Sequence, residues 1–259
     1  MARTLKVGGH AVKTKPLLSD AEEGSETRQT ANSAMELKLF EVDNGTCPYL
    51  DGRQWRSHIF LALNLDAPIY EILLNRGFRR SGTAFYKNSC VDCKMCVPIR
   101  IAVNTFRPSK SQKRTIRKNR ETTTTLHRIG YDESGFDLYK RYTSSRFGTE
   151  MTEEDYREIL MESPIETKLL KYHHNSRLIG IGWIDVLPRS LSSVYFAFEP
   201  EYSDRRLGIY SILREIELAR SLNKEFLHLG FWVRGCPSME YKKQYKPHQL
   251  LINGEWIQC

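Results

Sequence analysis

The chain has 259 residues, of which 40% are hydrophobic and 11% aromatic, so it can bury the core of one large domain or two small ones. No apolar run reaches the ~18–20 residues that a membrane span needs, and the N-terminus lacks the apolar segment of a secretion signal. These features exclude collagen, coiled-coil and integral membrane proteins and predict a cytoplasmic protein.

Positive charge is concentrated in one segment. The net charge is +8, from 39 Lys and Arg against 31 Asp and Glu. Residues 97–120 carry eight basic side chains and no acidic one, so the rest of the chain is neutral. Such a cationic strip predicts a polyanionic partner such as RNA, with a solvated helix face as the alternative.

The N-terminal half begins with a segment, residues 1–34, that has no aromatic side chain and is predicted to be disordered. The pattern then predicts strands at 37–40 and 59–63, a helix at 68–77, a hairpin at 78–87, a strand at 98–103, a helix at 109–119 and a strand at 122–128. Ser109 and Gln112 fit a capping box at the start of the second helix. Ile116 is its only large apolar residue, so this helix has no stripe that faces a core.

The C-terminal half has a different order of helices and strands. It is predicted to form helices at 132–146 and 152–162, strands at 167–172, 177–187 and 193–198, a helix at 207–222, a strand at 226–233 and a helical segment at 238–245. The buried stripe of the helix at 207–222 consists of Ile209, Ile212, Leu213, Ile216 and Ala219. The order predicts an α+β fold of mixed, mostly antiparallel sheets with flanking helices. We place a boundary between an N-terminal domain, 35–130, and a C-terminal domain, 131–259.

Four cysteines form a candidate metal site. Cys90, Cys93 and Cys96 follow the spacing C-x-x-C-x-x-C, and Cys47 lies upstream. Without a secretion signal, a disulfide scaffold is not expected. The thiols could bind zinc or an iron–sulfur cluster, or they could be buried and reduced.

A loop leads into a helix at Arg205-x-x-Gly208. Free amides at a helix start bind phosphate, and the spacing is similar to the pyrophosphate-binding turn of acetyltransferase-like folds. The alternative is a core helix capped by Ser203 or Asp204. The chain has no G-x-S-x-G, Walker lysine loop or H-E-x-x-H motif. The residues alone therefore leave open an acyl-CoA-dependent N-acetyltransferase and a metal-stabilised RNA-binding module.

Longer motifs resemble the aminoacyl-tRNA–protein transferases. Segments 47–50, 77–82, 90–100 and 106–112 are similar to the N-terminal half of that family. Segments 185–188, 193–195, 207–208, 230–232 and 236–242 are similar to its C-terminal half, and the likeness extends over about 37–256. The bacterial leucyltransferases that act on Asp and Glu resemble the chain most, and the arginyltransferases are wider relatives.

This resemblance implies an activity and its partners. An amino acid, leucine or alternatively arginine, would pass from charged tRNA to the N-terminal Asp or Glu of a protein, which is thereby marked for degradation by the N-degron pathway. The C-terminal half would be acetyltransferase-like, with the 3′ end of aminoacyl-tRNA in place of acetyl-CoA. No cofactor is required for this chemistry, because the ester is already activated and positioning supplies most of the rate.

The resemblance and the residue chemistry together give the candidate sites. The substrate carboxylate is expected at Arg79, Arg80, Ser81 and Arg107, since Arg binds carboxylates with two hydrogen bonds. Positioning, oxyanion donation or proton removal is expected from Tyr195, Asp204, Tyr241 and Lys242. Binding of tRNA is expected at Lys110, Lys113, Arg114, Arg117, Lys118, Arg205 and Gly208. Ser238 stands where members of the family often have Lys.

Overall fold

The computed structural model describes residues 4–7, 10–13 and 37–259. Its larger sheet contains β7 (Cys96–Ala102), β8 (Thr123–Arg128), β9 (Thr167–His174), β10 (Arg177–Val186), β11 (Ser190–Phe198), β12 (Phe226–Val233), β13 (His248–Ile252) and β14 (Glu255–Gln258). The strand order is β14-β13-β7-β12-β11-β10-β9-β8, and most neighbours are antiparallel. The predicted α+β class with mixed sheets is confirmed.

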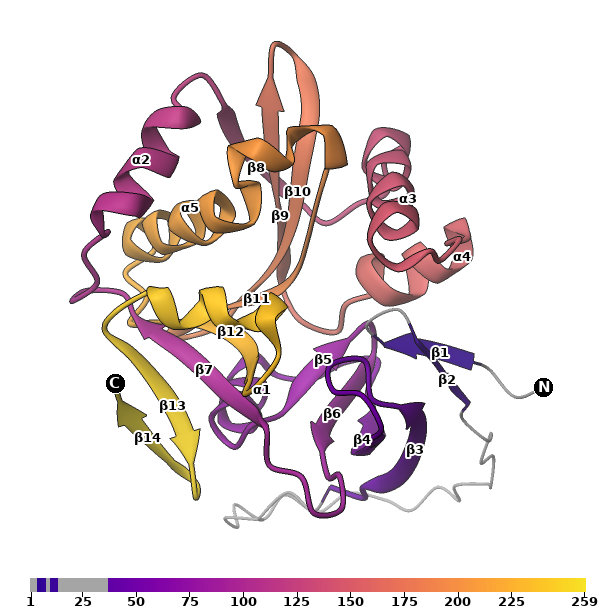
Figure 1. Cartoon of the computed structure of the whole chain (residues 1–259). Helices are drawn as coiled ribbons and strands as arrows, with labels where there is room; N and C mark the ends of the chain where they lie inside the picture. Colours follow the sequence, from indigo (N-terminus) through magenta and orange to yellow (C-terminus); the bar gives the residue numbers. More distant parts are fainter. Residues whose placement is uncertain (1–3, 8–9, 14–36) are drawn as a thin grey trace, which may run out of the picture.

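A smaller sheet of order β3-β4-β6-β5 lies below the larger one in Figure 1. It contains β3 (Phe40–Thr46), β4 (Gln54–Leu61), β5 (Arg79–Ser81) and β6 (Ala84–Asn88), and helix α1 (Ala67–Asn75) precedes β5. Aromatic rings hold α1 to this sheet, since Phe85 stacks on Phe60 at 5.0 Å and meets Tyr70 edge-on at 5.0 Å. The predicted helix at 68–77 and hairpin at 78–87 are confirmed. The strand predicted at 37–40 is wrong, because pairing begins only at Phe40.

Two short strands, β1 (Thr4–Val7) and β2 (His10–Lys13), form an antiparallel pair. They lie within the segment 1–34 that the sequence predicts to be disordered, so the structure differs from the prediction there. The remainder of that segment lies outside the described residues.

Helices cover both faces of the larger sheet (Figure 1). On one face lie α2 (Lys110–Lys118) and α5 (Leu207–Ser221), and on the other lie α3 (Glu133–Phe147) and α4 (Glu153–Tyr156). The helix predicted at 152–162 is α4 followed by a π-helical turn at Arg157–Met161, and the segment predicted at 238–245 is a 3-10 helix at Pro237–Gln244. Another 3-10 helix, Pro200–Arg205, leads into α5. In the described part of the chain, no helix combines the length and apolar character that crossing a bilayer requires.

The capping box of α2 is present as predicted. The Ser109 hydroxyl accepts from the Gln112 amide, and the Gln112 side chain accepts from the Ser109 amide. The buried side of α2 is polar: Gln112 donates to the Gln244 carbonyl, and Asn119, just after the helix, donates to the Arg205 carbonyl. Hydrogen bonds therefore replace the missing apolar stripe, and the basic side chains stay exposed.

The proposed boundary near residue 131 falls between elements of one sheet. Strands β7 and β8 precede it in sequence, yet they pair with β12 and β9, which follow it. The division into two domains remains a prediction. Whatever site lies on this sheet receives residues from both halves of the chain.

Candidate active site

The larger sheet opens between β11 and β12. These strands pair in parallel only over Ser190–Ser192 and Phe226–His228. Beyond that point β11 continues along β10 while β12 continues along β7, and α5, which connects β11 to β12 in the chain, packs against both. We call the region between residues 193–198 of β11 and residues 229–233 of β12 the gap. Backbone groups at both edges of the gap need partners from elsewhere in the chain or from a ligand.

Lys242 occupies the β12 side of the gap. Its Nζ donates to the carbonyl of Leu229 at 2.9 Å and to that of Phe231 at 2.8 Å. These carbonyls flank Gly230, whose φ of +79° fits the bulge in β12 and is a conformation that glycine adopts readily. Burial, aided by the nearby Arg79 guanidinium, lowers the pKa of Lys242 to about 7. Near neutral pH much of it is therefore an amine that donates twice and keeps a lone pair.

Arg79 reaches the gap from β5 in the smaller sheet and is 7% exposed. One terminal nitrogen donates to the Ser192 hydroxyl at 3.0 Å, and the other donates to the Ser193 carbonyl. A Cβ on Gly230 would lie 3.4 Å from the guanidinium carbon. The guanidinium therefore extends from β11 to the bulge of β12 and satisfies the β11 edge as Lys242 satisfies the β12 edge.

Glu215 brings a buried carboxyl to the gap from α5. It is 0% exposed, and its Oε1 accepts from the Ser193 hydroxyl at 3.3 Å. Its Oε2 has no hydrogen-bond partner among the described residues. Burial raises the pKa of Glu215 to about 8, although Ser193 and Arg79 oppose the shift. The side chain is thus mostly protonated at neutral pH.

The raised pKa of Glu215 makes the stability of the protein depend on pH. The folded state keeps a proton that the unfolded chain releases between pH 4.5 and about 8, so the stability that this carboxyl contributes is lost as pH rises through that interval. Glutamine mimics the protonated form and does not titrate. We expect the gain in unfolding free energy on Glu215→Gln to be a few kcal/mol larger at pH 8.5 than at pH 5. Urea unfolding at both pH values checks this, and an equal effect at both would contradict it.

Two tyrosines from the predicted site lie near the gap. Burial raises the pKa of Tyr241 to about 12, and the nearby Tyr142 and Glu215 act in the same direction. Tyr195 is packed edge-on against Tyr139 at 5.5 Å in an aromatic cluster beside α3. Burial also raises the pKa of Tyr195, so both phenols remain protonated at neutral pH. Tyr241 lies near enough to Glu215 for its carboxyl to act on the phenol, whereas Tyr195 packs against the core.

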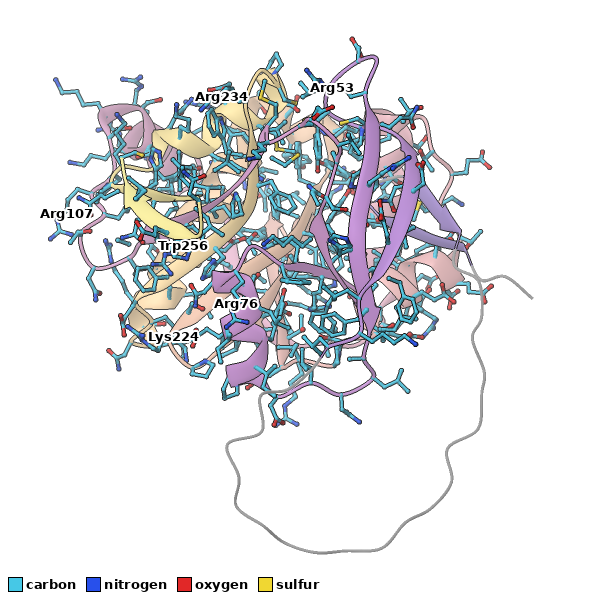
Figure 2. All side chains as sticks on the ribbon, turned by 90° about the horizontal axis from the view of Figure 1, so that it is seen from below. Arg53, Arg76, Arg107, Lys224, Arg234 and Trp256 are labelled. Atoms are coloured by element: carbon cyan, nitrogen blue, oxygen red, sulfur yellow. The ribbon has the colours of Figure 1, made fainter. Side chains whose placement is uncertain are left out.

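The other expected carboxylate ligands lie elsewhere. Arg80 is 4% exposed and forms two hydrogen bonds with Asp185 and one with Thr167 at 2.8 Å, so its charge is already balanced inside the fold. Ser81 is buried in β5 opposite Ala84. Arg107 is exposed at the edge of the molecule in Figure 2 and donates to the carbonyls of two neighbouring residues in the chain. Of this set, only Arg79 reaches the gap.

The predicted tRNA-binding residues gather where α2 meets the start of α5. The side chains of Lys118 and Arg205 contribute to this junction: Lys118 pairs with Asp204 at 2.9 Å, and Arg205 donates to the Lys118 carbonyl at 3.4 Å. A Cβ on Gly208, in the first turn of α5, would meet no described atom within 4 Å other than those of its chain neighbours and the helix's own backbone. The basic side chains of α2 that are exposed and have no acidic partner within 4.0 Å in the described part of the chain are Lys110, Lys113, Arg114 and Arg117.

Asp204 lies on the surface rather than in the gap. Its bond with Lys118 lowers its pKa, so the carboxylate is ionised and paired. The contacts that the structure describes connect Asp204 to α2, and none of them connects it to Lys242.

Comparisons with known proteins cover both halves of the chain. The family described as "Arginine-tRNA-protein transferase, N terminus" matches residues 45–114, and "Arginine-tRNA-protein transferase, C terminus" matches residues 134–252. An aspartate/glutamate leucyltransferase of Saccharophagus degradans is 36% identical over 229 residues, which are 86% of this chain and 97% of the relative. The chain belongs to the aminoacyl-tRNA–protein transferase family.

Further similar proteins span most of the chain. An aspartate/glutamate leucyltransferase of Chromobacterium violaceum is 34% identical over 89% of this chain and 97% of its own length. Among solved structures, FemX has a TM-score of 0.47 at 9% identity and covers 82% of this chain and 85% of that one. Both halves matched by the transferase family contribute to the gap, since Arg79 lies in the first, and Glu215 and Lys242 lie in the second.

The four thiols of this transferase are close enough to influence one another. Burial raises the pKa of Cys96 to about 12, with Cys47, Cys90 and Cys93 adding to the shift. However, the Cys90 sulfur is 3.4 Å from the Arg56 amide, which donates to it. Within the described ranges, no group of three or more His, Cys, Asp or Glu side chains is arranged to hold a metal ion. The thiols as placed do not fit the predicted zinc or iron–sulfur site.

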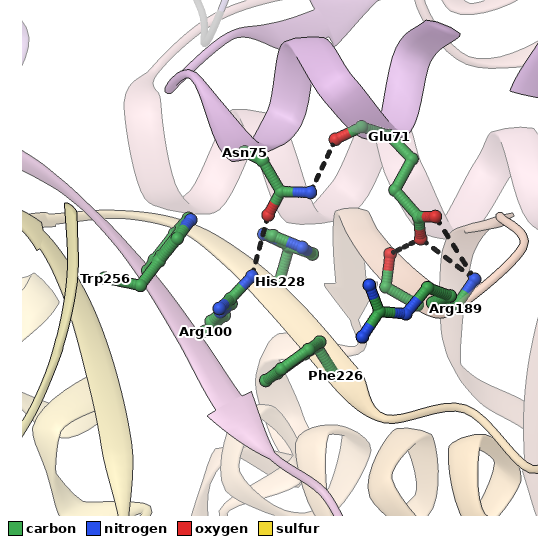
Figure 3. A pocket seen from close by; sticks show the side chains of 8 residues that line it. Glu71, Asn75, Arg100, Arg189, Phe226, His228 and Trp256 are labelled. Atoms are coloured by element: carbon green, nitrogen blue, oxygen red, sulfur yellow. Dashed lines mark hydrogen bonds between the residues drawn. The ribbon is translucent and has the colours of Figure 1, made fainter. Parts of the chain in front are cut away.

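Sequence reasoning missed Glu215, Arg100 and His228. Glu215 had a signal, because it lies three residues after Ile212 and four before Ala219 and so shares the buried stripe of α5. Arg100 lies in the basic strip and in the family motif at 90–100, and His228 lies in the strand predicted at 226–233, but neither pattern singles these side chains out as site residues. Together these two line a pocket near the gap (Figure 3).

Proposed function

We propose that this chain transfers leucine from leucyl-tRNA to the N-terminal amine of proteins that begin with Asp or Glu. The observation that carries the proposal is the 36% identity to an aspartate/glutamate leucyltransferase over 97% of its length. In the cytoplasm, the product would be a protein marked for degradation through its new N-terminal leucine.

The reaction forms an amide at the expense of an ester. The acceptor amine attacks the ester carbonyl, the new C–N bond forms, and the C–O bond to the ribose breaks. The attacking nitrogen loses one proton and the departing ribose oxygen gains one. A single group with a pKa near neutrality can carry that proton.

Lys242 has the properties of such a proton carrier. The carbonyls of Leu229 and Phe231 fix its Nζ at the gap, and they orient the lone pair of the neutral amine away from themselves. Its pKa of about 7 lies close to that of a free α-amine, ~8. We assign Lys242 to accept the proton from the acceptor amine and to return it to the ribose oxygen. Arg79 and Tyr241 would position the donor carbonyl in the gap.

The exposed basic face of α2 would bind the phosphates of tRNA beside the start of α5. We expect the joint substitution of Lys110, Lys113, Arg114 and Arg117 by Ala to weaken tRNA binding and to reduce the slope of log Kd against log salt by about one for each lost phosphate contact. Filter binding at several salt concentrations measures the slope. Substituting only the paired Lys118 is the matched control and should change the slope less. An unchanged slope in the fourfold variant would remove α2 from the tRNA interface.

The function itself is tested by one assay with several arms. Purified protein is incubated with radiolabelled leucyl-tRNA or arginyl-tRNA and with peptides that begin with Asp, Glu or Lys. We expect label from leucyl-tRNA on the Asp and Glu peptides, and loss of that transfer after ribonuclease treatment. Transfer from arginyl-tRNA instead would favour an arginyltransferase. Acetylation of a peptide by acetyl-CoA that is insensitive to ribonuclease would overturn the proposal.

A further inference from the structure

A pocket of about 310 Å³ lies on the face of the larger sheet opposite α5 (Figure 3). The end of α1, the starts of β11 and β12, and one residue each of β7 and β14 form its walls. Arg100 of β7 projects into it between two aromatic rings, 3.7 Å from the centre of Phe226 and 4.2 Å from that of Trp256. Neither the proposed transfer step nor the tRNA-binding face uses this pocket.

Among the described residues, no carboxylate lies within 4.0 Å of the Arg100 guanidinium, although Glu71 and Glu225 are near enough to favour its charge. Its Nε donates to Gln249 and its Nη1 to Asn75, each at 2.7 Å, and both acceptors are neutral amides. The other charges of the pocket are already engaged. Arg189 is paired with Glu225, and the Glu71 carboxylate accepts from the Arg189 amide and the Ser190 hydroxyl. A half-buried guanidinium that no carboxylate contacts directly is costly, which favours an anionic ligand.

Two further polar groups of the pocket are buried and have no hydrogen-bond partner among the described residues. They are Nε2 of His228, a side chain that is 3% exposed, and Nε1 of Trp256. Burial lowers the pKa of His228 well below its ordinary value, and Arg100 and Arg79 act in the same direction. The imidazole is thus neutral and can donate one hydrogen bond. The indole N–H donates only, so this set suits an oxygen-bearing anion.

The pocket lies about two strand residues away from the gap. His228 is paired with Ser192, whose hydroxyl accepts from Arg79, and Gly230 beside Arg79 lies two residues further along β12. Two strand residues span about 6–7 Å. An amino acid whose amine lies in the gap can therefore extend its side chain toward Arg100.

We propose that this pocket binds the side-chain carboxylate of the acceptor's first residue, with Arg100 as its counter-ion. This inference rests on the proposed function and specifies where its Asp or Glu selectivity arises. The three arginines expected from sequence are otherwise placed, because Arg79 bonds to β11, Arg80 is paired with Asp185, and Arg107 is on the surface. A guanidinium can bind a carboxylate through two parallel hydrogen bonds, which a neutral amide side chain cannot match.

The test compares Asp- with Asn-starting peptides, which differ in charge but hardly in size. For Arg100→Gln we expect the ratio of kcat/KM for the two peptides to fall about thirtyfold or more, while Kd for leucyl-tRNA is unchanged. Arg76→Gln removes an exposed cation beside Asn75 and is the matched control, with the ratio retained. If Arg100→Gln lowers both kcat/KM values by one factor, Arg100 is structural and the inference fails. A retained ratio with a raised Kd for tRNA would place a phosphate in the pocket and also overturn it.

A binding measurement decides the matter without catalysis. Because Trp256 lies against Arg100, a peptide that begins with Asp should change the tryptophan fluorescence of the wild-type chain, and its Asn counterpart should not. The change should be absent from Trp256→Phe. If the wild type transfers no leucine but shows this response, the proposed function fails and the carboxylate pocket stands. If it transfers leucine but shows no response to the Asp peptide, the pocket assignment fails alone.

Discussion

Lys242→Arg should fold like the wild type and transfer leucine about 10³-fold more slowly, with unchanged affinity for leucyl-tRNA. Arginine can still donate to the Leu229 and Phe231 carbonyls, so the bulge of β12 keeps its partners. It cannot accept a proton at accessible pH. Single-turnover transfer from preformed leucyl-tRNA complex measures the step directly, and thermal unfolding verifies the fold.

The pH dependence of the wild type gives an independent check on Lys242. Since both the Lys242 amine, with its pKa of about 7, and the acceptor α-amine, with its pKa of ~8, must be neutral, the single-turnover rate should rise with pH through both values and level off above them. Lys242→Met keeps the length of the side chain but loses both hydrogen bonds, so it should lose stability as well as activity. Near-normal activity in Lys242→Arg would show that the lysine only supports the backbone and would remove it as the proton carrier.

Asp185→Asn should lower the free energy of unfolding by about 3–5 kcal/mol, the largest stability change that we expect. Asp185 is 0% exposed and accepts from two nitrogens of Arg80 and from the Thr167 hydroxyl, so its loss as an anion leaves a buried guanidinium without a counter-ion. Urea unfolding monitored by circular dichroism measures the change.

A double variant separates charge from shape at the same position. Arg80→Met with Asp185→Leu removes both charges and keeps apolar volume, and it should recover much of the stability that Asp185→Asn loses. If the double variant were the less stable of the two, the ion pair itself would be the stabilising element rather than the avoidance of an unpaired charge.

Local signals explain which elements the sequence predicted. The capping box of Ser109 and Gln112 placed the start of α2, and the apolar stripe placed α5. A hairpin at β13–β14 is not among the predicted elements, although the Asn253-Gly254 dipeptide is a typical signal of a two-residue hairpin turn. In the structure these two residues have φ values of +52° and +87°, as such a turn requires. The strand predicted at 37–40 is wrong because a short apolar run does not indicate where pairing with a neighbouring strand begins.

The site was harder to predict because long-range pairing assembles it. The motifs around Arg79 and Lys242 suggested that both residues matter, but nothing local indicates that they satisfy opposite edges of one gap. Arg79, Arg80 and Arg107 have the same side chain, so the sequence cannot distinguish them. Only their tertiary contacts show that Arg79 alone reaches the gap. The environment of Arg100 depends on an aromatic ring from near the end of the chain, that of Trp256, which packs against the guanidinium.

The pairing of β7 with β12 also bears on the order of biosynthesis. Ala102 of β7 lies beside Phe226 of β12, so the centre of the larger sheet cannot close until most of the polypeptide has left the ribosome. During translation, the edge of β7 would remain open to wrong partners. Such nonlocal topology slows folding, and we expect nascent molecules of this transferase to depend on chaperones that shield exposed strands.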